Sequence, residues 1–195
     1  MDSELILSLL IGVGLSASVG FRIFIPFLVL SIFSLLGFVN LSSGFDWIGT
    51  YPALIAFGFA SLVEIVAYFF PWFDNLLDTI AGPASIIAGA LVMGSVLADF
   101  SPLLKWSLAI IAGGGLAGTI QHSTGLLRLT SSTTTGGIAN PVISTTEAGA
   151  SFSLSALAIL LPAVAFLVVL LLIIWVVKKF RKIFFKRKML KQEIN

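Results

Sequence analysis

The 195-residue sequence contains no cysteine and a single histidine, His122. The lack of cysteine excludes disulfides, thiolate nucleophiles and thiolate metal sites, and one histidine excludes a histidine-rich metal site. The G-x-S-x-G and H-E-x-x-H motifs and the phosphate-binding P-loop are also missing. We therefore expect no catalytic residues, no metal and no cofactor, and we rank a membrane-embedded enzyme third among the possible functions.

Charged residues are scarce as well, at 10% of the chain, whereas 58% of the residues are hydrophobic. The mean hydropathy of +1.11 lies well outside the range of a soluble domain with a charged surface. A transmembrane helix needs roughly 20 apolar residues to cross about 30 Å of hydrocarbon, so a chain of this length holds about five to seven spans. The composition predicts an all-α, polytopic membrane protein with one transmembrane domain over residues 1–177.

The basic residues are concentrated at the C-terminus. Eight of the eleven Lys and Arg residues lie between Lys178 and Lys191, which gives residues 178–195 a net charge of +7 and leaves −5 on residues 1–177. Positive charge beside a span favours the cytoplasmic side. We expect a multi-pass protein of the cytoplasmic membrane whose basic cytoplasmic tail contacts anionic lipid of the bilayer, and not nucleic acid. Monomeric and homo-oligomeric states are both open.

The apolar segments set the number of spans, and they cover residues 5–39, 52–70, 83–98, 103–120 and 152–177. The first is too long for one crossing, because a helix over 5–39 would measure about 52 Å. We expect a break between Ser18 and Pro26, which leaves either two short spans or one broken helix, and five or six spans in total. Residues 72–80 place apolar side chains on one face and Asp74 and Asp78 on the other, which predicts a short interfacial helix.

Proline and small residues indicate where helices begin and where they pack. Ser101-Pro102 predicts a helix start after a tight hairpin, and Pro52, Pro83 and Pro141 can begin helices in the same way. Gly12, Ser16 and Gly20 recur at every fourth position, and Gly114 with Gly118 repeats the pattern. Small residues at this spacing let helices approach closely in membranes, so we interpret both stripes chiefly as packing surfaces.

Three ionisable residues fall within or next to the apolar segments. Arg22 lies at the centre of the first one, where a charge near mid-membrane costs at least about 2.5–3.5 kcal/mol unless it finds a partner or water. Glu64 lies inside 52–70 and is expected to pair with Arg22, His122 or Arg128, or to carry a proton. His122 follows 103–120 and is either an interfacial residue or a proton relay. Arg22 has an alternative position at an interface, where its side chain would extend to water.

The segment 130–147 is rich in hydroxyl groups although it lies between two strongly apolar regions. It contains Thr134, Thr135, the flexible pair Gly136-Gly137 and the helix-start signal Asn140-Pro141. A helix from Pro141 to Val177 would measure about 55 Å, so we expect 141–150 to form a half-helix or re-entrant piece before the last span. Such a break could offer N–H groups to an anion or carbonyls and hydroxyls to a cation, with Glu147 facing the same cavity. The alternative is an ordinary polar surface loop.

Three motifs together resemble a family of small bacterial membrane proteins that is catalogued only as a domain of unknown function. They are Gly20-Phe21-Arg22-Ile23-Phe24-Ile25-Pro26, then Glu64 followed by Pro71-Trp72-Phe73-Asp74 and Asp78, and Thr134-Thr135-Gly136-Gly137-Ile138-Ala139-Asn140-Pro141. The likeness covers nearly the whole chain, and the last motif is the most specific. The resemblance implies a compact helical membrane fold and supplies neither a substrate nor an activity.

The two interrupted elements carry the functional hypothesis. We expect a small transporter or channel-like protein for a small, anionic solute, with Arg22 and Thr134, Thr135, Gly136, Gly137 and Asn140 as the binding residues. Glu64, Glu147 and His122 are the candidates for proton coupling or ion pairing. The competing hypothesis is a membrane scaffold or lipid-interacting subunit that transports nothing.

Overall fold

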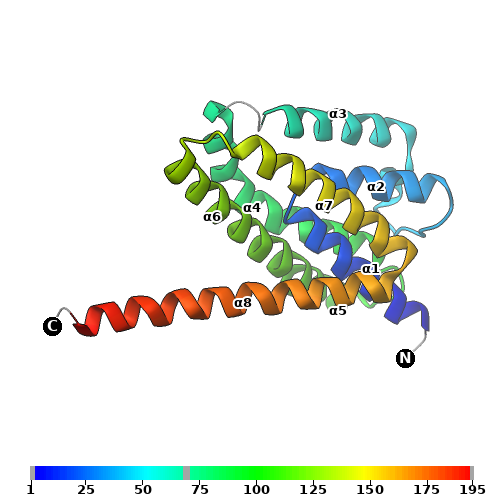
Figure 1. The fold of residues 1–195 in the computed structure, drawn as a ribbon. Coiled ribbons are helices and arrows are strands. Elements are labelled where there is room, and N and C mark those ends of the chain that lie inside the picture. Colours follow the sequence, from blue (N-terminus) through cyan, green and yellow to red (C-terminus); the bar gives the residue numbers. More distant parts are fainter. Residues whose placement is uncertain (1–2, 68–70, 194–195) are drawn as a thin grey trace.

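A computed structural model describes residues 3–67 and 71–193, with residues 71–78, 180 and 182–193 described by their backbone alone. Every element in these ranges is helical, which confirms the all-α prediction (Figure 1). The elements are α1 (Ser3–Val19), α2 (Phe24–Leu35), the 3₁₀ turn η1 (Asp46–Gly49), α3 (Tyr51–Ala67), α4 (Pro71–Val96), α5 (Pro102–Leu108), the π-helical segment η2 (Ala109–Gly114), α6 (Gly115–Thr135), α7 (Asn140–Leu160) and α8 (Pro162–Glu193).

Four helical stretches of the described chain are long and apolar enough to cross a membrane, and they are Thr79–Val96, Pro102–Thr135, Asn140–Leu160 and Pro162–Lys179. The helices α1, α2 and α3 are also apolar but shorter. This pattern confirms a polytopic helical membrane protein with interrupted helices. The C-terminal part of α8 extends beyond the other helices in Figure 1.

The first apolar segment forms a helical hairpin, with its break where the sequence predicts one. Helix α1 ends at Val19 and α2 begins at Phe24. The middle of α1 and the loop after α2 both lie against the last turns of α4, because Gly12 packs on Met93 and the Ser42 N–H donates to the Ser95 carbonyl at 2.7 Å. At the tip of this hairpin, Gly20 and Arg22 are buried between the other helices.

The stripe of small residues on α1 packs as predicted. The Ser16 hydroxyl donates to the Gly89 carbonyl of α4 at 3.0 Å, across a distance that only small side chains permit. A Cβ atom added to Gly20 would lie 2.5 Å from Cβ of Ile120 on α6. Helix α1 thus lies at the centre of the bundle, in contact with α4, α6, α7 and α8.

The structure differs from the sequence-based boundaries in the stretch that was expected to form an interfacial helix. Residues 72–80 are the first turns of α4, and Pro83 lies inside this helix instead of beginning it. Proline is tolerated within membrane helices because neighbouring groups satisfy the backbone that it leaves unpaired. The predicted apolar and acidic faces of 72–78 concern side chains outside the described residues.

The last apolar segment also differs, because 152–177 is not one helix. Helix α7 runs from Asn140 to Leu160, full length and not the half-helix expected at 141–150, and α8 starts at Pro162. Leu161 between them has φ −137° and ψ 68°, outside the helical region. A residue that precedes proline is disfavoured in helical geometry, so Pro162 accounts for the break.

The hydroxyl-rich segment is mostly helical rather than a loop. Helix α6 continues through Thr135 and ends at Gly136, whose φ of +63° gives the left-handed cap that commonly terminates helices. Gly137 also has a positive φ, of +86°, and α7 begins at Asn140. A four-residue turn therefore connects α6 and α7 at the end of the bundle toward which the C-terminal part of α8 runs.

Candidate functional site

The tip of the α1–α2 hairpin places a guanidinium inside the bundle. Arg22 is fully buried, with 0% of its surface exposed. Its Nη2 donates to the carbonyl of Ser144 on α7 at 3.1 Å and to the hydroxyl of the same residue at 2.5 Å. The same nitrogen lies 3.3 Å from Oε2 of Glu147, one turn further along α7. Arg22 therefore has partners within the bundle and does not reach an interface.

A second buried arginine meets the same carboxylate from α6. Arg128 is 1% exposed, its Nε donates to Oε1 of Glu147 at 3.2 Å, and its Nη2 lies 3.0 Å from Oε2. Two nitrogens of one guanidinium face two oxygens of one carboxylate, the geometry of a bidentate, charge-assisted pair. Glu147 is 5% exposed and bridges Arg22 and Arg128.

Glu64 of α3 completes the group of buried charges. Its Oε1 accepts a hydrogen bond from the Ile23 N–H at 2.8 Å, and its Oε2 accepts one from the Phe24 N–H at 3.0 Å. These amides begin α2, so the carboxylate caps the positive end of that helix dipole from a neighbouring helix. Glu64 also lies within electrostatic range of Arg22 and Arg128. We call Arg22, Glu64, Arg128 and Glu147 the charge cluster, and its formal charges sum to zero.

The charge cluster lies within two stripes of buried polar side chains, one on α6 and one on α7. Each stripe repeats at three- or four-residue spacing, so its members share one helix face. The outward faces of the same two helices carry exposed apolar residues such as Leu126, Leu129 and Val142. The stripes consist of Gln121, Thr124, Arg128 and Ser131 on α6, and of Asn140, Ser144, Glu147, Ser151 and Ser155 on α7.

The polar stripes reach from the α6–α7 turn past the charge cluster toward the opposite end. Arg128 and Glu147 each lie seven residues from that turn, at Thr135 and Asn140, which corresponds to about 10 Å along the helix axis. Beyond the cluster, the Ser151 hydroxyl donates to the Ser18 carbonyl of α1 at 3.0 Å. The bundle is thus apolar on its outer face and polar along one internal line.

The structure brings some of the residues selected from the sequence together and separates others. Arg22, Glu64 and Glu147 meet in the charge cluster. Thr134 and Thr135 are exposed near the end of α6, where their hydroxyls donate to the carbonyls of Thr130 and Ser131 at 2.8 Å.

The remaining selected residues lie away from the cluster as well. Gly136 and Gly137 form the adjoining turn, and Asn140 is buried there with its Nδ2 donating to the Ser132 hydroxyl at 2.9 Å. His122 lies on α6 and is exposed toward a separate cleft, which it lines together with α4 and α8. Its Nδ1 lies 2.7 Å from the Gly118 carbonyl, a contact within its own helix.

Sequence reasoning missed the pairing of Arg128 with Glu147 and the contact of Ser144 with Arg22. The polar positions 140, 144, 147, 151 and 155 do repeat at helical spacing, which could have identified an inward polar face. The expectation of a short, interrupted piece at 141–150 concealed that pattern. Within the described part of the chain, no group of three or more His, Asp or Glu side chains is placed to hold a metal ion.

The model of a family described as Domain of unknown function (DUF4126) matches residues 9–182. Neither a curated protein nor a solved structure matches the chain.

Proposed function

This chain belongs to the DUF4126 family, and we propose that it is a small transporter or channel-like membrane protein for a small anionic solute. The observation that supports this proposal is the position of Glu147, one carboxylate held between two buried arginines. Its two oxygens occupy the place that the oxygens of an anionic solute would take. By the charge of its tail, we also propose that the protein lies in the cytoplasmic membrane with its C-terminus in the cytoplasm.

The electrostatics of the charge cluster favour exchange of one anion for another. Removing Glu147 from between Arg22 and Arg128 would leave uncompensated buried charge, which typically costs about 3–5 kcal/mol. A solute carboxylate or phosphate arriving as Glu147 takes up a proton would keep the cluster neutral at each step. Glu147 would then act as the proton-coupling group, and the two guanidiniums would bind the solute.

The polar stripes of α6 and α7 supply the rest of the proposed pathway. Hydroxyl groups on both sides of the charge cluster, along α6 and α7, can replace water around a solute inside a bundle whose outer surface is apolar. The hairpin tip at Arg22 belongs to the class of interrupted helices that build binding sites in many transporters. Movement of the α1–α2 hairpin against α7 would expose the cluster to one side or the other.

A flux measurement in proteoliposomes tests the proposal. We expect uptake of a labelled small anion, tried in turn as phosphate, sulfate and acetate, to exceed that of empty vesicles and to increase with an inward proton gradient. Arg128→Met should reduce the flux at least about tenfold, because a buried charge-assisted contact contributes about 1.5–3 kcal/mol. Glu147→Gln should remove the dependence on the proton gradient.

Lys105→Met is the matched control, because Lys105 is also a buried cation but contacts Ser42, Phe45 and Trp106, away from the charge cluster. It should leave the flux per folded protein unchanged. Flux no higher than that of empty vesicles for all three anions would contradict the proposal, as would equal loss in the Arg128 and Lys105 variants.

One observation favours the competing proposal of a membrane scaffold. Arg22 is completely enclosed and the charge cluster is already neutral, as a purely structural ion-pair network requires. In a scaffold the cluster would hold α2, α3, α6 and α7 in a fixed arrangement. That function predicts no flux in any variant, together with loss of a bound partner or lipid when the cluster is disrupted.

A further inference from the structure

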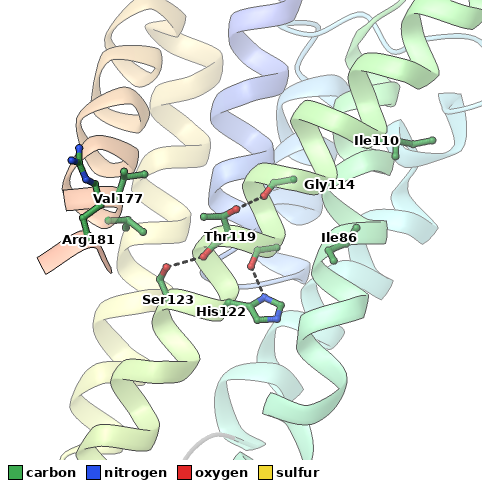
Figure 2. A pocket seen from close by; sticks show the side chains of 11 residues that line it. Ile86, Ile110, Gly114, Thr119, His122, Ser123, Val177 and Arg181 are labelled. Atoms are coloured by element: carbon green, nitrogen blue, oxygen red, sulfur yellow. Dashed lines mark hydrogen bonds between the residues drawn. The ribbon is translucent and has the colours of Figure 1, made fainter. Parts of the chain in front are cut away.

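A cleft of about 750 Å³ opens between α4, α6 and α8, on the outside of the bundle and away from the charge cluster. Figure 2 shows Val177 and Arg181 of α8 on one side of it and Ile86 of α4 on the other, with α6 between them. All three helices contain stretches that are long and apolar enough to span a membrane. Hydrocarbon chains of the bilayer therefore have direct access to the cleft.

The chemistry of the cleft changes along its length. Helices α6 and α8 run in the same direction, since α7 returns the chain between them. Along η2 and α6 the lining passes from Ile110 through glycines to Thr119 and Ser123, and on α8 it passes from Val176 to Arg181. Both walls are thus apolar at one end and polar at the end that leads to the basic tail.

A smaller cleft of about 290 Å³ adjoins the first. Ser123 and Val176 line both clefts, and Lys179 lies in the smaller one with its Nζ 4.7 Å from the centre of the Trp175 ring. Each of the two neighbouring apolar clefts has a cation at the end nearest the basic C-terminal tail. This arrangement matches a phospholipid with one acyl chain in each cleft and its anionic headgroup at the cations.

We propose that this pair of clefts binds an anionic phospholipid, with its phosphate at Arg181 and its acyl chains on either side of Val176. The charge is complementary, because an exposed arginine beside a membrane span attracts the anionic headgroup layer. The hydroxyl hydrogens of Thr119 and Ser123 are donated to the carbonyls of Gly115 and Thr119 at 2.7 and 2.8 Å. Their oxygens can therefore accept hydrogen bonds, which suits a headgroup that carries hydroxyls.

Native mass spectrometry of the full chain in detergent tests the site, with phosphatidylglycerol and phosphatidylcholine of equal chain length supplied together. The wild-type protein should retain phosphatidylglycerol in preference, by about tenfold. Arg181→Ala should abolish the preference. Lys178→Ala, its matched control, removes an equal charge three residues earlier at an exposed position that lines neither cleft and should leave the preference unchanged.

A second pair of variants tests the apolar part. Gly115 lines the large cleft, and a Cβ added there meets nothing within 4 Å, so Gly115→Leu should fill the cleft without disturbing the fold and expel the lipid. Gly125→Leu, equally unhindered but outside both clefts, should retain it.

Three results would overturn the lipid proposal. The first is equal retention of both lipids by the wild-type protein, and the second is identical lipid retention by all four variants. The third is a dimer that Gly115→Leu dissociates, since the cleft would then hold a second copy of this chain. The readout is bound lipid and not flux, so it is independent of the transport proposal.

Discussion

Replacing Glu147 by glutamine should destabilise the protein more than any other single change of similar size. The substitution keeps the shape of the side chain but leaves Arg22 and Arg128 without the negative charge that lies 3.3 and 3.0 Å from their Nη2 atoms. The charge cluster would change from neutral to a net charge of +1 in a region where these side chains are 0% and 1% exposed. Water cannot compensate a charge that is enclosed to this extent.

The expected loss follows from the behaviour of broken buried ion pairs. Removing one partner typically costs about 3–5 kcal/mol. For a chain of 150–250 residues, each kcal/mol lowers the Tm by roughly 2–4 °C, so we expect the apparent Tm to fall by about 6–20 °C. Thermal unfolding of the purified protein in detergent, followed by loss of the monodisperse peak in size-exclusion chromatography, measures this change.

A double-mutant cycle separates the charge effect from general damage. Arg128→Met alone gives the cluster a net charge of −1, whereas Glu147→Gln combined with Arg128→Met restores neutrality. The double variant should therefore be more stable than the sum of the two single losses predicts, by about 1.5–3 kcal/mol. An apparent Tm of Glu147→Gln equal to that of the wild-type protein, or strict additivity in the cycle, would refute the account of the charge cluster.

Two further predictions concern the hairpin. Gly20→Ala should lower the free energy of unfolding by about 1–3 kcal/mol, because its Cβ would lie 2.7 Å from the Ala117 carbonyl oxygen. The control Gly125→Ala, whose Cβ would meet no atom within 4 Å, should stabilise α6 by roughly 0.5–1 kcal/mol. Equal Tm values for the two variants would contradict the close approach at Gly20. Glu64→Gln should weaken the cap of α2 by about 1.5–3 kcal/mol. Hydrogen exchange at the Ile23 and Phe24 amides should then accelerate, and unchanged protection would show that the carboxylate does not hold them.

The sequence predicts the elements of this fold where a local signal decides them. The break before Phe24 follows from a segment too long for one crossing, and the helix start at Pro102 follows from a proline signal. The close contacts of Gly12 and Ser16 follow from small residues at every fourth position. Each of these inferences depends on one continuous stretch of the sequence.

The helix boundaries that the sequence did not predict lie at prolines, where the local sequence alone does not decide whether a helix continues. Pro83 and Pro162 are both prolines, yet Pro83 lies inside α4 and Pro162 begins α8. Whether a proline breaks a membrane helix depends on neighbours that satisfy its backbone, and these come from other parts of the chain. Composition around each proline therefore does not distinguish the two cases.

The charge cluster was predicted in part for a similar reason. The cost of burying Arg22 and Glu64 indicates that they need partners but does not select them. Ser144 is 122 residues from Arg22 in the sequence, and only the packing of the hairpin tip against α7 brings them together. Arg128 and Glu147 are 19 residues apart and meet because α6 and α7 both continue as regular helices to the intervening turn.

The most direct test of the transport account is the accessibility of Ser144, which accepts hydrogen bonds from Arg22 of the charge cluster. The chain has no native cysteine, so Ser144→Cys carries a single thiol at a position that is 1% exposed. Thr134→Cys, at an exposed position in the last turn of α6, serves as the labelling control.

A membrane-impermeant thiol reagent should label the cysteine at position 144 slowly from each side of the membrane in turn, and excess transported anion should slow the labelling. A cysteine that reacts only after denaturation, while the control at position 134 reacts fully from one side, would contradict the account and identify the cluster as a permanently sealed part of a scaffold.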